Sequence, residues 1–249
     1  MLDSEDIFSH ITQSGKKDRK SSAQNPLLAQ GISVYKSKNY LKALQIFEKL
    51  DSEKKNSAEV YYFMALCHCR LARFASARAV FRKVLSSQPD IFFFVQSHML
   101  LAYLDARDDL LDTAEEHIYA LLKKNLENAQ MYGILGYIYN KRKDFSQAEY
   151  YYKKALAIDP ENANCHNGIG YNYTEWNTKL DAAQEHLAKA VDLDRDNPAY
   201  LDSLGWLYFF KKQFSRAVFF LTKAVRVSDH KEILSHLEQI RAAQSGAHE

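Results

Sequence analysis

Apolar residues recur along this chain at helical spacing, in a pattern that repeats six times. In each unit an alanine precedes a large apolar residue by four positions and another apolar residue by seven, so that the three lie on one helical face. The six alanines are Ala43, Ala77, Ala114, Ala148, Ala183 and Ala217, at intervals of 34, 37, 34, 35 and 34 residues. The pattern predicts an amphipathic helix in every unit.

A second column of small residues precedes each alanine by twelve positions, or by thirteen before Ala183. It consists of Gly31, Ala65, Ala102, Gly136, Gly170 and Gly205. Small residues at this register allow two helices to approach closely, where added bulk would cost roughly 1–3 kcal/mol. Each unit is therefore predicted to be a pair of helices, at 26–37 and 40–51, 58–71 and 74–87, 91–107 and 110–124, 128–142 and 145–158, 162–176 and 180–193, and 197–210 and 214–227.

The composition favours an all-α fold. Of 249 residues only eight are Gly and four are Pro, which leaves little material for the tight turns of β-sandwiches and propellers. Hydrophobic residues make up 47% of the chain and charged residues 26%, so a packed core is expected. The net charge of +2 excludes the strong basic field of proteins that bind nucleic acid without sequence preference.

The fourth unit resembles the tetratricopeptide repeat (TPR) family. The residues that carry the resemblance are Tyr132, Leu135, Gly136, Tyr139, Ala148, Tyr152, Ala155 and Pro160. The resemblance implies an all-α fold, a right-handed α-solenoid of stacked antiparallel helix pairs. It covers residues 24–230 as six repeats, at 24–57, 58–91, 95–128, 129–162, 163–197 and 198–230. The segment 202–206, with His236 and Leu237 downstream, also resembles the end of many bacterial TPR proteins.

Two segments flank the predicted repeats. Residues 1–23 are expected to form an N-terminal tail and linker, with a short helix at 3–13 that either docks on the repeats or remains disordered. Residues 231–249 are expected to form a capping helix and a tail, because a solenoid otherwise ends in an exposed apolar face. The apolar face predicted for the capping helix consists of Ile233, Leu234, Leu237 and Ile240.

The TPR resemblance implies that the first helix of each pair lines a concave groove. On this basis the sequence predicts a partner-binding groove rich in aromatic side chains, because Tyr and Trp provide large contact areas with few torsions to immobilise. The predicted groove residues are Tyr62, Tyr103, Tyr137, Asn140, Asn167, Tyr171, Trp206 and Phe209. The alternative is that these rings pack between adjacent first helices and expose only their edges.

On the first helices, the column Ile32, Leu66, Tyr103 and Tyr137 is followed four positions later by four cations, Lys36, Arg70, Arg107 and Lys141. They are candidate contacts for an acidic ligand, which they would steer into the groove. The alternative is that each stabilises the end of its own helix through the helix dipole, worth about 0.3–1 kcal/mol. A separate candidate site for self-association is the run Phe92, Phe93 and Phe94, because three successive helical positions point in different directions.

The sequence offers no catalytic or metal-binding constellation. Cys67 and Cys69 flank His68, but residues two apart on a helix diverge by about 200° and cannot bind one ion together. No cofactor, metal or enzymatic activity is therefore expected. The N-terminus is acidic rather than signal-like, no apolar run reaches membrane-spanning length, and three cysteines do not form a disulfide framework, so a cytoplasmic location is predicted.

These features predict a non-catalytic adaptor or scaffold that binds a segment of a protein partner in its aromatic groove. Two alternatives remain open at this point. One is a homo-oligomeric structural component of a larger assembly. The other is a helical repeat that binds single-stranded RNA, which the balanced charge disfavours.

Overall fold

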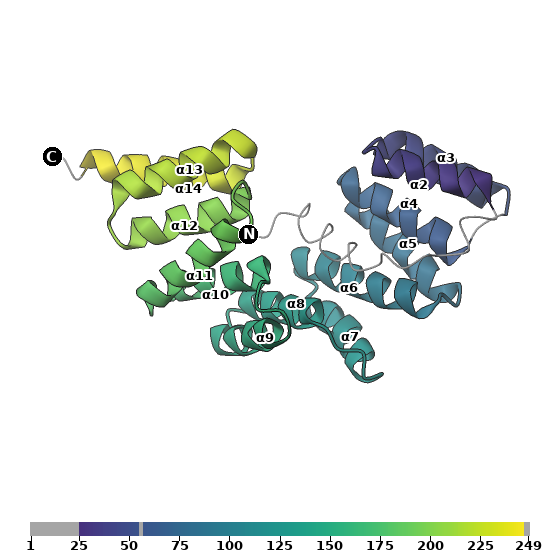
Figure 1. Cartoon of the computed structure of the whole chain (residues 1–249), viewed down its shortest axis with the longest axis horizontal. Coiled ribbons are helices and arrows are strands. Elements are labelled where there is room, and N and C mark those ends of the chain that lie inside the picture. Colours follow the sequence, from purple (N-terminus) through teal and green to yellow (C-terminus); the bar gives the residue numbers. More distant parts are fainter. Residues whose placement is uncertain (1–24, 55–56, 247–249) are drawn as a thin grey trace. The chain divides into compact units, whose positions relative to one another are not determined.

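The computed structural model describes residues 25–54 and 57–246, and their regular elements are all α-helices (Figure 1). The first helices of the pairs are α2 (Pro26–Lys36), α4 (Ala58–Arg70), α6 (Ile91–Arg107), α8 (Ala129–Lys141), α10 (Ala163–Glu175) and α12 (Pro198–Phe210). The second helices are α3 (Tyr40–Ser52), α5 (Phe74–Ser86), α7 (Leu111–Leu122), α9 (Phe145–Ile158), α11 (Leu180–Leu193) and α13 (Phe214–Val227). A last helix, α14, spans Lys231–Gly246. The predicted all-α class is confirmed, while the helix predicted at 3–13 lies outside the described residues.

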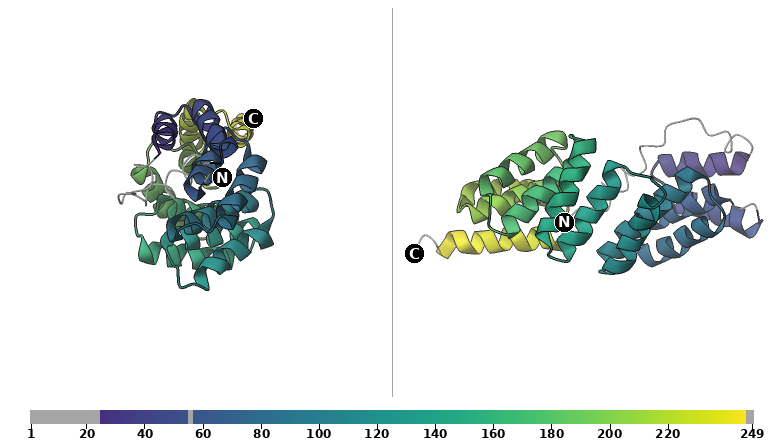
Figure 2. Two further views of the ribbon diagram at one scale, coloured as in Figure 1. Left: turned by 90° about the vertical axis from the view of Figure 1, so that its right-hand side faces the viewer. Right: turned by 90° about the horizontal axis from the view of Figure 1, so that it is seen from below.

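The helices form two compact units. The N-terminal unit contains α2 to α7 and ends at Leu126, whereas the C-terminal unit contains α8 to α14 and begins at Glu127. The sequence predicted one array over 24–230, and the division falls beside the expected junction of its third and fourth repeats. In both units successive helices pack against each other, and each first helix also contacts the next first helix of its unit (Figure 2).

The first helix of every pair begins with a side-chain cap. The capping side chain accepts a hydrogen bond from a backbone N–H in the first turn, where the helix itself supplies no acceptor. The six caps are Asn25, Ser57, Asp90, Asn128, Asn162 and Asn197. Pro26 and Pro198 occupy the first helical positions, where their missing N–H groups cost nothing.

The turn inside each pair contains a non-glycine residue with positive φ. Left-handed backbone is disfavoured for such residues, so each turn is held by the packing of the helices it joins. The turn residues are Lys38, Ala72, Asp109, Lys143, Asn177 and Lys212, with φ between 48° and 62°. This geometry explains how the chain reverses direction six times with so few glycines.

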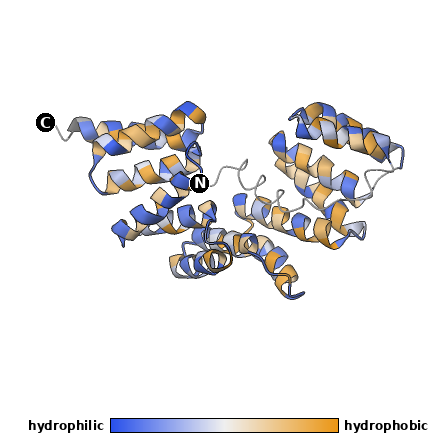
Figure 3. Ribbon diagram, viewed as in Figure 1, coloured by the Kyte–Doolittle hydropathy of each residue, from blue (hydrophilic) through white to orange (hydrophobic). Residues whose placement is uncertain are grey.

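The two predicted columns meet in the core. All six column alanines and the large apolar residues four positions later are buried. A Cβ built at Gly136 would lie 2.5 Å from the Tyr152 ring, and one built at Gly205 would lie 2.9 Å from the Leu221 side chain. The small residues therefore make room for the large ones, as their spacing predicts. In Figure 3, hydrophobic and hydrophilic residues alternate along the helices, as amphipathic helices require.

The capping helix α14 packs against α13 and α12. Ile233, Leu237 and Ile240 are buried there, as the sequence predicts. The prediction for Leu234 was wrong, because its side chain is 37% exposed. Leu234 follows Ile233 by one residue, a rotation of about 100° that turns it away from the buried stripe.

Two repeats contain a pair of histidines that joins their two helices. His98 of α6 and His117 of α7 bring their Nδ1 atoms to 3.0 Å, and His117 Nε2 lies 3.5 Å from buried Asp105 Oδ2. His166 of α10 and His186 of α11 bring their Nδ1 atoms to 2.9 Å. Since a hydrogen bond between two Nδ1 atoms needs one of them unprotonated, neither pair tolerates two imidazolium rings.

These pairs predict a loss of stability in mild acid. Burial lowers the pKa of His98 to about 4, and charge repulsion from His117 and Lys124 adds to this effect. The pKa of His186 is also lowered, mainly by burial and further by charge repulsion from His166 and Lys153. An unfolded histidine has a pKa of about 6.5, so the unfolded chain binds more protons below that pH. The free energy of unfolding should therefore be unaffected by these groups above about pH 6.5 and fall as the pH falls towards 4.

Urea denaturation at pH 7.0, 6.0 and 5.0, followed by far-UV circular dichroism, measures this dependence. The variant with His98→Gln and His186→Gln removes both groups and should lose part of the wild-type acid sensitivity. The Glu149 carboxylate contributes little above pH 5, because hydrogen bonds from Lys153 and Tyr173 outweigh its burial and lower its pKa to about 2. Equal acid sensitivity in the variant and the wild type would contradict the prediction.

Candidate functional site

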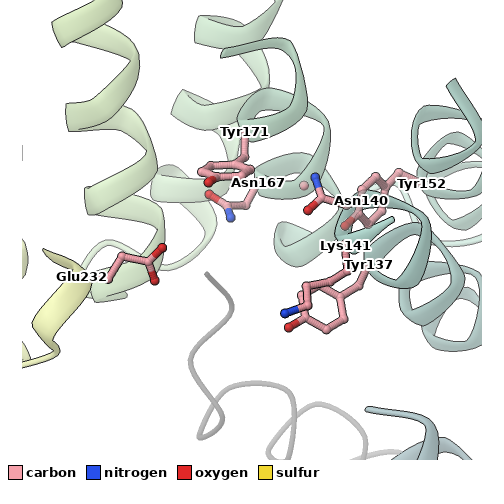
Figure 4. Close-up of a pocket in the computed structure, with 8 residues that line it drawn as sticks. Tyr137, Asn140, Lys141, Tyr152, Asn167, Tyr171 and Glu232 are labelled. Atoms are coloured by element: carbon pink, nitrogen blue, oxygen red, sulfur yellow. The ribbon is translucent and has the colours of Figure 1, made fainter. Parts of the chain in front are cut away.

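A pocket of about 130 Å³ lies in the C-terminal unit, between side chains of α8, α9, α10 and α14 (Figure 4). Most of its lining comes from two consecutive first helices, α8 and α10, on which Tyr137 and Tyr171 occupy equivalent positions. The lining residues are Tyr137, Asn140, Lys141, Tyr152, Asn167, Gly168, Tyr171 and Glu232. The pocket thus combines phenol rings, side-chain amides and charged groups of both signs.

The α8 and α10 residues reach the pocket because of their helical spacing. Tyr137 and Lys141 are four residues apart on α8, as are Asn167 and Tyr171 on α10, so each couple projects from one helix face. Gly168 allows the neighbouring Tyr152 ring to lie directly against α10, since a Cβ there would be 2.4 Å from Tyr152 Cζ. The ring of Tyr152 thereby packs between two repeats while also lining the pocket.

The amides of the pocket differ in their partners. Asn140 donates a hydrogen bond from its side-chain nitrogen to Asn172 Oδ1. Asn167 is only 3% exposed, and its Oδ1 accepts no hydrogen bond from the described residues. A buried carbonyl oxygen without a donor is costly, by about 1–3 kcal/mol, so Asn167 is the strongest local indication of a ligand.

Three carboxylates act on Tyr171 at the pocket, and one of them, Glu232, lines it. The pKa of Tyr171 is raised by burial and further by the negative charges of Glu175, Glu232 and Asp202. Two of these carboxylates have donors of their own: Glu175 Oε1 accepts from the Trp206 indole at 2.8 Å, and Asp202 Oδ1 lies 2.9 Å from His236 Nδ1. The local potential beside Tyr171 is thus negative, although the chain as a whole is nearly neutral.

Helix α14 is fixed against α12 by His236. Its ring stacks on Trp206, with centroids 4.2 Å apart and planes 17° apart, and its Nδ1 contacts the buried carboxylate of Asp202. Glu232 precedes His236 by one helical turn and therefore lies on the same face. The contact between His236 and Asp202 consequently helps to hold Glu232 at the pocket.

The structure brings together five of the residues predicted from the sequence: Tyr137, Asn140, Lys141, Asn167 and Tyr171. Trp206 and Phe209 do not line this pocket, and their rings stack on each other with centroids 5.1 Å apart. The indole N–H of Trp206 donates a hydrogen bond to Glu175, and the Trp206 ring also stacks on the His236 ring. Trp206 therefore supports the position of α14 rather than offering a free ring.

Tyr62 and Tyr103 do not line this pocket. They belong to the N-terminal unit, where their side chains are 3% and 1% exposed. Tyr62 packs against several aromatic rings, including Phe93 at a centroid distance of 5.1 Å.

The four predicted cations also differ in their surroundings. Arg107 packs on the Phe74 ring, with its guanidinium carbon 3.4 Å from the centroid, and donates to Asp108 Oδ1 at 3.0 and 3.1 Å. Arg70 lies 6.0 Å from the centroid of the Tyr40 ring. Lys36 is exposed, and only Lys141 lines the pocket described above. Arg107 is thus held by its own unit.

The aromatic run on α6 is partly covered. Phe93 is buried, and Phe92 and Phe94 are half-buried. Phe94 contacts His98, with ring centroids 4.6 Å apart. The Phe93 ring packs beside Tyr62, so Phe92 and Phe94 are the more accessible rings of the predicted self-association site.

Three lining residues, Tyr152, Gly168 and Glu232, were not predicted as site residues. Tyr152 was interpreted from its column as a core residue, and it is indeed buried. Glu232 was not singled out, because it lies outside the repeats. Its only sequence signal is the four-residue spacing to His236, which becomes meaningful once Asp202 is known to be the partner of His236.

The stacked helix pairs of both units define a helical-repeat protein. A family model described as the tetratricopeptide repeat protein 21 C-terminal ARM domain matches residues 5–174. The chain belongs to this tetratricopeptide-repeat family, as the sequence columns predict. No helix in the ranges that the structure describes has both the length and the apolar character needed to cross a membrane.

Individual relatives agree with this assignment. The TPR repeat-containing protein PA4667 of Pseudomonas aeruginosa is 31% identical over 62% of this chain and 26% of its own length. The mitochondrial import receptor subunit TOM70 of Homo sapiens is 19% identical over 86% of this chain and 36% of its own length. The chain thus spans about a quarter to a third of these two curated relatives.

A solved structure shows the same fold. The tetratricopeptide repeat protein from Parabacteroides merdae superposes with a TM-score of 0.74 at 14% identity, over 96% of this chain and 91% of that one. At this level of identity the comparison concerns the fold alone.

Proposed function

We propose that this chain is a non-catalytic protein-interaction scaffold whose C-terminal unit binds an extended segment of a partner protein in the pocket described above. The observation that carries the proposal is the Asn167 oxygen, a buried acceptor without a donor among the described residues. An extended peptide has backbone N–H groups that can satisfy such an acceptor. Tyr137 and Tyr171 supply the adjoining aromatic surface.

A binding role agrees better with the chemistry of the chain than catalysis does. The cysteines Cys67, Cys69 and Cys165 are buried, and burial raises the pKa of each thiol, that of Cys67 to about 12. They are therefore held as thiols, whereas nucleophilic catalysis requires a thiolate. Three unpaired cysteines also fit a reducing compartment such as the cytoplasm, and a bacterial origin agrees with the relative in Pseudomonas aeruginosa.

Two alternative functions have less support. Single-stranded RNA carries phosphates that the carboxylates around Tyr171 would repel, although Lys141 lies on the opposite side of the pocket. Self-association through α6 would depend on Phe92 and Phe94 alone, because Phe93 is buried. Binding of a protein segment agrees better with the aromatic rings, amides and charges that line the pocket.

Replacing Tyr171 by alanine tests the proposal. The immobilised full chain is incubated with a degenerate heptapeptide library, and retained peptides are quantified by mass spectrometry. Tyr171→Ala should reduce retention about 30-fold, because a buried aromatic contact of this kind is worth on the order of 2 kcal/mol. The matched control is Tyr150→Ala, which removes a tyrosine that is 51% exposed and does not line the pocket.

The two variants separate binding from folding. Tyr150→Ala should retain peptides as the wild type does, and both variants should keep the wild-type far-UV spectrum. If Tyr171→Ala retained peptides as well as Tyr150→Ala, the pocket would not be the binding site. If the wild type retained no peptide, the proposed function itself would be wrong.

A further inference from the structure

The charges that line the pocket are unevenly distributed, and their arrangement indicates which kind of side chain the pocket would bind. Glu232 enters it from α14, whereas Lys141 enters from α8 (Figure 4). Near Glu232 lie Tyr171 and, beyond it, the carboxylates of Glu175 and Asp202, whose charges reach the Tyr171 hydroxyl. One side of the pocket is therefore rich in hydrogen-bond acceptors and negative in potential.

Glu232 differs from the two neighbouring carboxylates because it has no partner. Glu175 accepts from Trp206, and Asp202 contacts His236. The Glu232 side chain makes no hydrogen bond or ion pair with any residue in the described part of the chain. A half-buried carboxylate that lines a pocket and has no counter-ion is a natural contact for a cation supplied from outside.

Asn167 provides a second, independent indication of the same chemistry. Its side chain is almost fully buried, lines the pocket beside Tyr171, and presents an oxygen without a donor. Together Glu232 and Asn167 call for a ligand rich in N–H groups. A carboxylate or phosphate ligand would leave the Asn167 oxygen unsatisfied and be repelled by Glu232.

We propose that the pocket binds an arginine side chain of the partner segment, with Glu232 as its counter-ion, Asn167 Oδ1 as an acceptor and the Tyr171 ring as a stacking surface. The guanidinium group is planar and carries five N–H donors, so it can reach two acceptors while lying on an aromatic ring. The pocket volume of about 130 Å³ is below the roughly 300–1,000 Å³ of sites that enclose a whole small molecule, which suits one side chain of a longer segment.

This inference rests on the proposed function, and the experiment distinguishes the two. Three heptapeptide libraries are prepared that are randomised except at the central position, which is arginine, citrulline or glutamate. Citrulline has nearly the shape of arginine but no charge. The full-length wild type should retain the arginine library about tenfold better than the citrulline library, and the glutamate library least.

Glu232→Gln should reduce the preference for arginine over citrulline to about twofold or less, and Glu232→Lys should favour the glutamate library. The matched control is Glu238→Gln, which removes an exposed carboxylate of the same helix that does not line the pocket. This control should keep the tenfold preference.

Each outcome has one meaning. Equal retention of the arginine and citrulline libraries would overturn the arginine assignment while leaving the proposed function intact, as would an arginine preference that persists in Glu232→Gln. Retention of none of the three libraries would overturn the proposed function, and the arginine assignment with it.

Discussion

Truncation of Tyr152 to alanine is expected to lower the free energy of unfolding of the C-terminal unit by about 3–5 kcal/mol, the usual cost of removing a buried aromatic ring. Tyr152 is buried, and its ring fills the space left by two glycines. A Cβ at Gly136 or Gly168 would approach the ring to 2.5 and 2.4 Å. Two helices of one pair and the first helix of the next pair therefore depend on this one side chain.

The glycines make the prediction sharper. In the wild type, Gly168→Ala should be destabilising, because the added methyl group overpacks the contact with Tyr152 at a cost of roughly 1–3 kcal/mol. The higher helix propensity of alanine offsets about 1 kcal/mol of this cost. In the Tyr152→Ala background the ring is absent, so the same Gly168→Ala change should be stabilising. This reversal of sign is a direct test of contact between the two positions.

Tryptophan fluorescence measures the effect in the relevant unit. Both tryptophans of the chain, Trp176 and Trp206, lie in the C-terminal unit, so their emission during urea denaturation reports that unit alone. The control Tyr152→Phe keeps the ring and should cost less than about 1.5 kcal/mol. A Tyr152→Ala variant as stable as Tyr152→Phe would show that the ring does not hold the repeats together.

Asp202→Ala is expected to loosen α14 by about 1–3 kcal/mol, because it leaves the partly buried His236 without its hydrogen-bond partner. Asp202 is itself buried, and its carboxylate oxygens lie 2.9 and 3.1 Å from His236 Nδ1. Since Glu232 lies one turn from His236, the same change should weaken retention of the arginine peptide library. Hydrogen exchange of the α14 amides, followed by mass spectrometry, measures the loosening.

A surface ion pair supplies the control for this second prediction. Asp181 is also paired, with Lys211 at 2.8 Å, but its side chain is 98% exposed. Asp181→Ala should therefore leave both α14 exchange and peptide retention unchanged. Exchange in α14 that is no faster in Asp202→Ala than in Asp181→Ala would mean that the buried pair does not anchor the helix.

Much of the fold follows from spacing alone. The alanine column, the small-residue column and the helix caps act within one pair of helices, and their contacts join residues close in sequence. Gly136 and Tyr152, for example, are sixteen positions apart and meet as the columns predict. The TPR resemblance, which assigns the first helices to one groove, implies a common surface for Tyr137, Asn167 and Tyr171, and all three line the pocket.

The solvent accessibility of the aromatic rings, and the contacts between residues far apart in sequence, could not be predicted from spacing. Tyr103 and Tyr137 occupy equivalent positions, yet Tyr103 is 1% exposed whereas Tyr137 lines a pocket. Which rings are covered depends on side chains of other repeats, and periodicity within one helix carries no information about them.

The sequence by itself therefore determined the helix pairs, their number and the face that each presents, because these depend on local spacing and on size matching between neighbours. Tertiary structure decided which of those faces carries a pocket. It brought Glu232 from outside the repeats to the side chains of α8 and α10, and it paired His236 with Asp202 across thirty-four positions. Such contacts depend on how helices distant in sequence pack, and for that reason the charge of the pocket emerged only from the folded chain.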